Sequence, residues 1–155
     1  MKIISHRHTG LIVNDLDKML DFYLGLGFEL RRRDIEEGSF VNNLVGEKNI
    51  KLETAKLILN NKKIDFQYRF QLELIFIFNT KKNVKNTGNF NFKNCFGLVD
   101  LSFTVDKIDE FINFIVDNGG KQISKPSKSP EGYPALHSYC CDPEGNVLHL
   151  AENLK

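Results

Sequence analysis

Two imidazoles and two carboxylates of this sequence are placed so that they could bind a metal ion together. They are His8 and Glu73 in the first half of the chain and Asp100 and His149 in the second half. Nitrogen and oxygen donors of this kind bind divalent ions such as Ni, Zn, Co, Mn or Fe, and a catalytic site keeps one coordination position open for water or substrate. The residues therefore predict a metal centre. The same residue types also permit hydrogen-bonded pairs across a sheet without a metal.

An internal repeat brings these four residues to equivalent positions. Residues 8–17 return 92 positions later as residues 100–109, which matches His8 to Asp100. A second match aligns residues 72–74 with 148–150, which makes Glu73 the counterpart of His149. Adjacent side chains of a strand point to opposite faces, so each of the four is expected on the face that lies away from the apolar, helix-packed layer.

Apolar periodicity predicts the same order of elements in both halves, namely a strand, a helix and then three strands. The expected strands cover 6–13, 28–33, 54–59 and 70–78, then 98–105, 122–123, 137–141 and 147–152. Asn14 or Asp15 is expected to cap the first helix and Asp106 the second, and residues 34–51 are expected to form a loop with a short helical turn.

Neither half has enough apolar surface to bury its sheet alone, so we expect the halves to share a core. We predict an α+β fold in which paired βαβββ modules form a cupped mixed sheet with the helices on its outer face. Residues 1–155 are expected to form a single domain. It contains a first module over 6–78, a linker over 79–97 and a second module over 98–152.

Composition narrows the class of protein. The chain has 155 residues, of which 41% are hydrophobic and 26% charged, as in ordinary globular proteins. Its net charge of +1 gives no reason to expect nucleic acid or a membrane surface as a partner. No stretch approaches the roughly 20 apolar residues that cross a bilayer, and the N-terminus is too short and polar for a signal peptide. We therefore expect a cytoplasmic protein.

Four stretches make the chain resemble the vicinal oxygen chelate superfamily, which includes glyoxalase I, methylmalonyl-CoA epimerase, extradiol dioxygenases and bleomycin-resistance proteins. They are HTGLIVNDL at 8–16, DFYLGLGF at 21–28, LEL at 72–74 and YCCDPEGNVLHL at 139–150. Together they span nearly the whole chain. The resemblance implies the paired βαβββ fold and a metal held in a cupped sheet.

The resemblance also implies a ligand set, to which this chain conforms in part. Glyoxalases and epimerases of the superfamily use His then Glu or Gln from the first module, and His then Glu from the second. His8 and Glu73 match the first pair. Asp100 stands where His is expected and His149 where Glu is expected, so the second module keeps the same donor types in the reverse order.

The implied reaction moves a proton α to a carbonyl while the metal acts as a Lewis acid. His149 or Glu73 is the expected base, since an unperturbed imidazole pKa of about 6.5 suits proton transfer. His137 and Tyr139 share strand parity and are expected to line the substrate pocket.

The first hypothesis is thus a metal-dependent lyase or isomerase, of glyoxalase I or methylmalonyl-CoA epimerase type, acting on a thioester or a hemithioacetal. The relatives also imply a homodimer. The alternatives are a metal-free protein that binds a small molecule, as bleomycin-resistance proteins do, and an extradiol-type dioxygenase. The dioxygenase is disfavoured because its usual His, His, Glu order is absent from this sequence.

Overall fold

The computed structural model describes residues 1–2, 4–80, 97–130 and 134–154. It divides the chain into two compact units, residues 1–83 and 84–155, and each is described here by itself. Nearly all of the linker expected over 79–97 lies outside the described residues.

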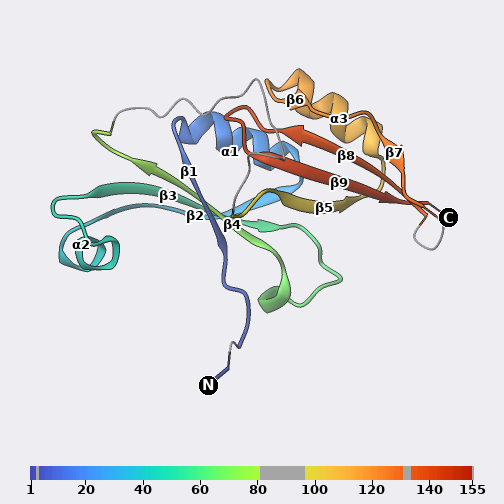
Figure 1. The fold of residues 1–155 in the computed structure, drawn as a ribbon. Coiled ribbons are helices and arrows are strands. Elements are labelled where there is room, and N and C mark those ends of the chain that lie inside the picture. Colours follow the sequence, from blue (N-terminus) through green and yellow to red (C-terminus); the bar gives the residue numbers. More distant parts are fainter. Residues whose placement is uncertain (3, 81–96, 131–133, 155) are drawn as a thin grey trace. The chain divides into compact units, whose positions relative to one another are not determined.

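The first unit contains one four-stranded sheet (Figure 1). Its elements are β1 (Thr9–Val13), α1 (Leu16–Gly25), β2 (Phe28–Glu37), α2 (Ser39–Val45), β3 (Lys51–Leu59), a 3-10 turn (Phe66–Tyr68) and β4 (Gln71–Ile77). The strand order is β1-β4-β3-β2, with β1 and β4 parallel and the other neighbours antiparallel. This order makes β4, which contains Glu73, a central strand.

The helix α1 forms where the sequence predicts it. The Asp15 carboxylate accepts a hydrogen bond from the backbone N–H of Lys18, which caps the helix. Met19 and Tyr23, one turn apart, are completely buried on the face that packs on the sheet. Gly27 follows the helix with a φ of 98°, a conformation that a residue with a side chain rarely adopts.

The region 34–51 contains the short helical segment expected there, but strand replaces part of the expected loop. It contains the end of β2, all of α2 and the first residue of β3. This end of β2 could not be recognised as a strand from the sequence. The reason is that β2 is an edge strand, and most of its side chains are exposed and charged. An edge strand needs no apolar alternation on its outer side, so the periodicity ended at Arg33 although the backbone pairing continues to Glu37.

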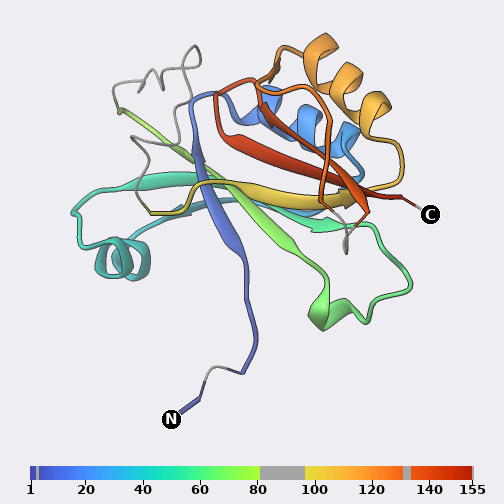
Figure 2. The same ribbon diagram turned by 45° about the vertical axis from the view of Figure 1, so that its right-hand side comes forward.

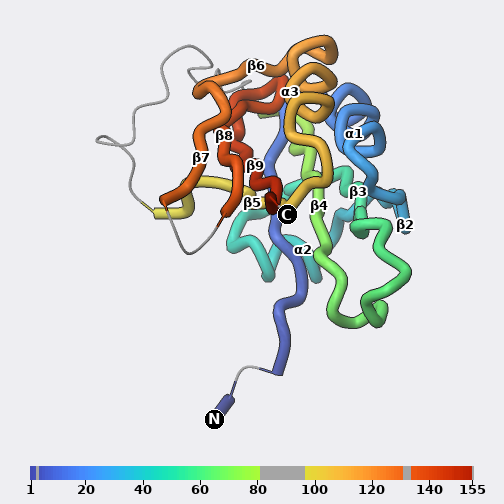
Figure 3. Tube along the Cα trace, turned by 90° about the vertical axis from the view of Figure 1, so that its right-hand side faces the viewer, coloured from blue at the N-terminus to red at the C-terminus, as the bar shows by residue number. Residues whose placement is uncertain are grey.

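The second unit repeats the plan of the first. It contains β5 (Leu101–Val105), α3 (Ile108–Asp117), β6 (Lys121–Gln122), β7 (Ser127–Lys128), β8 (Ala135–Cys141) and β9 (Val147–Asn153). The order is β5-β9-β8-β6, with β7 also paired to β8, and β5 and β9 are parallel. Figure 2 shows α3 along one face of this sheet, and Figure 3 shows β8 beside β9 and the short strand β7.

The cap of α3 is not the one expected from the sequence. Lys107, not Asp106, is the N-cap residue, and its side chain makes no capping hydrogen bond. Instead, Oε2 of Glu152 on β9 accepts a hydrogen bond of 2.7 Å from the backbone N–H of Ile108. Because this carboxylate belongs to a strand distant in sequence, local sequence rules for helix caps could not identify it.

The α+β class and the βαβββ plan are confirmed: each module contributes its own hydrogen-bonded mixed sheet. Among the described residues, no helix is both long and apolar enough to cross a membrane.

Candidate functional site

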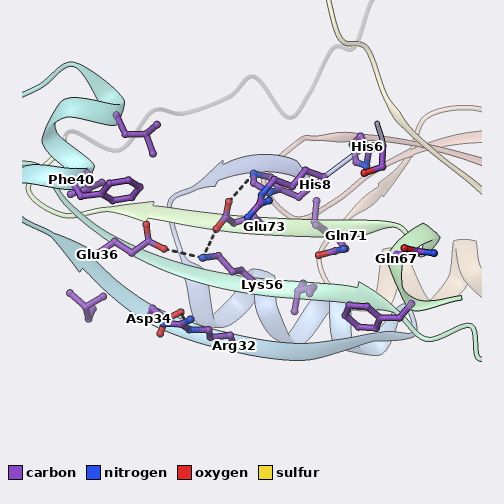
Figure 4. A pocket seen from close by; sticks show the side chains of 18 of the residues that line it. His6, His8, Arg32, Asp34, Glu36, Phe40, Lys56, Gln67, Gln71 and Glu73 are labelled. Atoms are coloured by element: carbon purple, nitrogen blue, oxygen red, sulfur yellow. Dashed lines mark hydrogen bonds and ion pairs between the residues drawn. The ribbon is translucent and has the colours of Figure 1, made fainter. Parts of the chain in front are cut away.

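The first module brings two of the predicted metal ligands together. In β4, Leu72 and Leu74 are buried in the core, and Glu73 between them points to the other face of the sheet. There, Oε2 of Glu73 lies 3.0 Å from Nε2 of His8, which precedes β1 (Figure 4). The Glu73 side chain is only 11% exposed, so a compensating partner is required for its charge.

Lys56 of β3 is a second partner of Glu73. The antiparallel register places Lys56 directly opposite Glu73, and its Nζ lies 3.4 Å from Oε1 of Glu73. The same Nζ lies 3.1 Å from Oε1 of Glu36, which also accepts a hydrogen bond from the hydroxyl of Thr54. Burial alone would lower the pKa of Lys56, but its hydrogen bond to Glu36 and the charges of Glu36 and Glu73 outweigh burial and raise it. Lys56 is therefore an ammonium at neutral pH.

A cavity of about 1180 Å³ opens over this face of the first module. His8, Lys56 and Glu73 contribute to its polar lining (Figure 4). Apolar side chains from β2 and α2 line it as well: Ile35, Phe40, Val41 and Leu44. The cavity thus offers a charged region and an apolar region, as small-molecule sites commonly do.

In the second module, His149 is held through both ring nitrogens. Its Nδ1 lies 3.0 Å from the hydroxyl of Ser102 on β5, and its Nε2 lies 3.0 Å from Nδ1 of His137 on β8. The ring of Tyr139 stacks on it with a centroid separation of 4.7 Å. Burial and the neighbouring His137 lower the pKa of His149, against the opposing charge of Asp100. His149 is therefore a neutral imidazole at physiological pH.

Asp100 lies just before β5 and influences the pKa of both Tyr139 and His149. Burial first, and then the charge of Asp100 and its hydrogen bond to the phenol, raise the pKa of Tyr139. The charge of Asp100 also favours protonation of His149. Asp100, Tyr139 and His149 thus form one electrostatic cluster in the second module.

The donor chemistry in each module fits a divalent cation. His8 and Glu73 provide an imidazole nitrogen and a carboxylate oxygen at 3.0 Å, and Asp100 lies near His149 in the second module. Within residues 1–2, 4–80, 97–130 and 134–154, no group of three or more His, Cys, Asp or Glu side chains gathers as a metal site. The four-ligand set therefore stays a prediction.

The sequence missed three residues that the structure connects to the predicted ones. Lys56 and Glu36 extend the Glu73 network, and Ser102 orients His149. A signal existed for Lys56, since it is a charged residue in the otherwise apolar stretch 55–59. Its partner could not be read from the sequence, because the register of β3 on β4 depends on the whole sheet. His137 and Tyr139 contact His149, while their expected contact with substrate stays a prediction.

Cys140 and Cys141, the two cysteines that the structure describes, are poorly suited to act as nucleophiles or metal ligands. Cys140 and Cys141 are buried, and burial raises the pKa of Cys140 to about 11 and also raises that of Cys141. Cys95 lies outside the described residues. The catalytic candidates therefore remain the imidazoles and carboxylates.

Comparison with known proteins agrees with this architecture. The chain is similar to a glyoxalase family protein from Bacillus cereus, with 22% identity, a TM-score of 0.83, and coverage of 100% of this chain and 97% of that one. A glyoxalase family protein from Enterococcus faecalis is 22% identical with a TM-score of 0.60, over 98% and 100% of the two chains. Glyoxalase I from Zea mays is 19% identical with a TM-score of 0.61, over 95% of this chain and 46% of the maize chain.

These identities establish the fold alone, and no match was found among curated proteins. The family assignment rests on a sequence model. The model of the Glyoxalase/Bleomycin resistance protein/Dioxygenase superfamily matches residues 6–150, nearly the entire chain. The chain therefore belongs to the Glyoxalase/Bleomycin resistance protein/Dioxygenase superfamily.

Proposed function

We propose that this protein is a metal-dependent lyase or isomerase that moves a proton α to a carbonyl group of a small molecule. The observation that supports this most directly is the His8–Glu73 pair, an imidazole and a shielded carboxylate at 3.0 Å on the wall of a large cavity. The proposed cation ligands are His8 and Glu73 from the first module and Asp100 and His149 from the second. A bound divalent cation would polarise the substrate carbonyl and make the α-proton more acidic.

The residues of the chain would bind and orient the substrate and accept the proton. The apolar side chains of α2 that line the cavity, among them Phe40 and Leu44, would hold the apolar part of a ligand and exclude water from it. His149 is suited to be the base only if it does not bind the cation, because its lowered pKa then keeps the imidazole neutral and able to accept a proton at physiological pH. Glu73 is the alternative base if one of its oxygens stays free of the cation.

A metal-free binding protein is the second candidate, and one observation favours it. Glu73 already has two polar partners in the first module, the imidazole of His8 at 3.0 Å and the ammonium of Lys56 at 3.4 Å. A buried carboxylate with two such partners needs no metal ion as a further partner. The cavity would then bind a small molecule without changing it.

Cation titration separates the two candidates. Chelator-treated protein is titrated with Zn, Ni, Co, Mn and Fe(II) ions by calorimetry, and bound metal is quantified after desalting. We expect one cation per site and at least about tenfold weaker binding in His8→Ala and Glu73→Gln. Substituting a residue that only hydrogen-bonds to a metal ligand already lowers metal affinity by about 10- to 100-fold.

Glu53→Gln is the matched control for Glu73→Gln. Glu53 is a carboxylate of the neighbouring strand β3 that pairs with Arg33, which in turn binds Asp17 of α1. Its substitution should leave cation affinity unchanged. If no cation binds in stoichiometric amount under any condition, the enzyme proposal is wrong and the binding-protein proposal stands.

The substrate class is tested by proton exchange. In deuterium oxide, a cation-loaded enzyme of glyoxalase type should exchange the α-proton of a hemithioacetal, and one of epimerase type should exchange that of a 2-substituted thioester. We further propose a homodimer, which light scattering of the purified chain would measure directly; a monomeric mass would contradict it.

A further inference from the structure

His137, which the sequence places in the substrate pocket, directly contacts the predicted metal ligand His149. His137 on β8 and His149 on β9 lie diagonally across neighbouring strands, because Tyr139 is the residue paired with His149. Diagonal side chains on one face of a sheet can reach one another when they are long or aromatic. Here Nδ1 of His137 and Nε2 of His149 are 3.0 Å apart.

This separation suits two nitrogens bound to the same cation. Imidazole nitrogens bind Zn at about 2.0–2.1 Å, so two nitrogens on one tetrahedral or octahedral ion are about 2.9–3.4 Å apart. With the plane of His149 fixed by its neighbours, the ring of His137 would turn so that its Nδ1 lone pair faces the shared ion. The proton that one of the two nitrogens contributes to the resting contact would move to the other nitrogen of its ring, so that each imidazole binds through one nitrogen and keeps its proton on the other.

The surroundings of His149 hold it in the form that binds metal. Nδ1 of His149 lies 3.0 Å from the Ser102 hydroxyl, which can accept the remaining N–H and fix the tautomer. The ring of Tyr139 stacks on His149 and fixes its plane. Asp100 adds a negative charge that attracts a cation to this place.

We propose that His137 and His149 together bind a divalent cation in the second module, with His137 as a metal ligand. The inference deepens the proposed function, since it rests on the same metal-binding role of His149. It assigns the cation to the imidazole-preferring group of Zn, Ni, Co and Cu, because two nitrogen donors favour these over Mg, Ca or Mn. Water molecules would complete the coordination shell.

The test is a calorimetric titration of the full, untagged chain with Zn and Co ions, repeated for four variants. His137→Gln keeps a side chain that can form hydrogen bonds but removes the imidazole, and it should weaken cation binding about 10- to 100-fold. Ser102→Ala removes only the orienting hydroxyl and should weaken binding less. His6→Ala is the control, because His6 is an imidazole of the first module to which no metal role is assigned, and it should change nothing.

His8→Ala, the fourth variant, separates this inference from the proposed function. Equal weakening by His8→Ala and His137→Gln supports both. Weakening by His137→Gln alone supports the histidine pair and contradicts the first-module ligands. Weakening by His8→Ala alone overturns the inference and leaves the proposed function standing. Unchanged binding in both variants, or no binding to the wild-type chain, overturns the inference and the proposed ligand set together.

The NMR spectrum keeps the result interpretable if a variant is unstable. In the wild-type chain, diamagnetic Zn should move the ring 15N signals of His137 and His149 to metal-bound positions together, while the ring 15N signals of His6 keep their metal-free values. A metal-bound 15N signal for His149 without one for His137 would refute the pair even if His137→Gln does not fold.

Discussion

Replacing Lys56 by Met should strengthen cation binding at Glu73. In the resting protein, Lys56 Nζ lies 3.4 Å from Oε1 of Glu73 and is therefore an internal competitor for the carboxylate that we assign to the metal. A cation that binds Glu73 must displace this ammonium or tolerate its repulsion. Met has a similar length and apolar stem but no charge, so it removes the competitor while filling the same space.

The magnitude follows from the geometry. Two unit charges at 3.4 Å attract by about 5 kcal/mol at an effective dielectric constant of about 20. The Lys56 side chain is 42% exposed and also pairs with Glu36, so solvent screening reduces the net effect to about 1 kcal/mol, as for surface ion pairs. Such a difference corresponds to roughly fivefold in Kd.

The assay is calorimetric titration of chelator-treated Lys56→Met with Zn or Co, beside the control Lys51→Met. Lys51 lies on the same strand, is 43% exposed and pairs with Glu37 at 3.2 Å, so it matches Lys56 in environment without touching Glu73. Lys51→Met should bind the cation like the wild type. Unchanged or weaker binding by Lys56→Met would refute the reasoning that Glu73 is a ligand for which Lys56 competes.

Three further predictions concern stability, each measured by urea unfolding. The pKa of His149 is lower in the folded than in the unfolded protein, so on acidification the imidazole of the unfolded chain is protonated first. The free energy of unfolding should therefore fall as the pH decreases below about 6.5, and His149→Gln should make this fall less steep. An equally steep fall in His149→Gln would contradict the direction of the pKa shift. Asp142→Ala should lower the free energy of unfolding by about 2–4 kcal/mol, because this buried carboxylate accepts hydrogen bonds from two backbone N–H groups and the Asn146 amide. A decrease of less than about 1 kcal/mol would be inconsistent with these hydrogen bonds. Gly120→Ala should destabilise by more than about 2 kcal/mol, since a Cβ there would collide with the backbone oxygen of Cys141; wild-type stability would show that the backbone yields easily.

The shared sheet face of His8 and Glu73 could be predicted because it depends on local alternation and on an internal repeat. Leu72 and Leu74 alternate with Glu73, which fixes the face of the carboxylate without any knowledge of the other strands. The same reasoning placed His149 on the polar face of β9, where Ser102 and His137 lie beside it.

Partners set by strand pairing could not be predicted in the same way. The contact of Lys56 with Glu73 requires the register of β3 on β4, and the diagonal contact of His137 with His149 requires the register of β8 on β9. Sequence alternation gives the face of a side chain but not its neighbour on the next strand. The cap that Glu152 provides for α3 was missed for the same reason.

The central claim, a cation-dependent transfer of a proton α to a carbonyl, is tested most directly by solvent exchange. Chelator-treated protein is incubated in deuterium oxide with a hemithioacetal or a 2-substituted thioester, with and without an added divalent cation, and deuterium at the α-carbon is followed by NMR. We predict exchange only with the cation, and its loss in Glu73→Gln but not in the control Glu53→Gln. Exchange that is equally fast without the cation, or in Glu73→Gln, would contradict the claim.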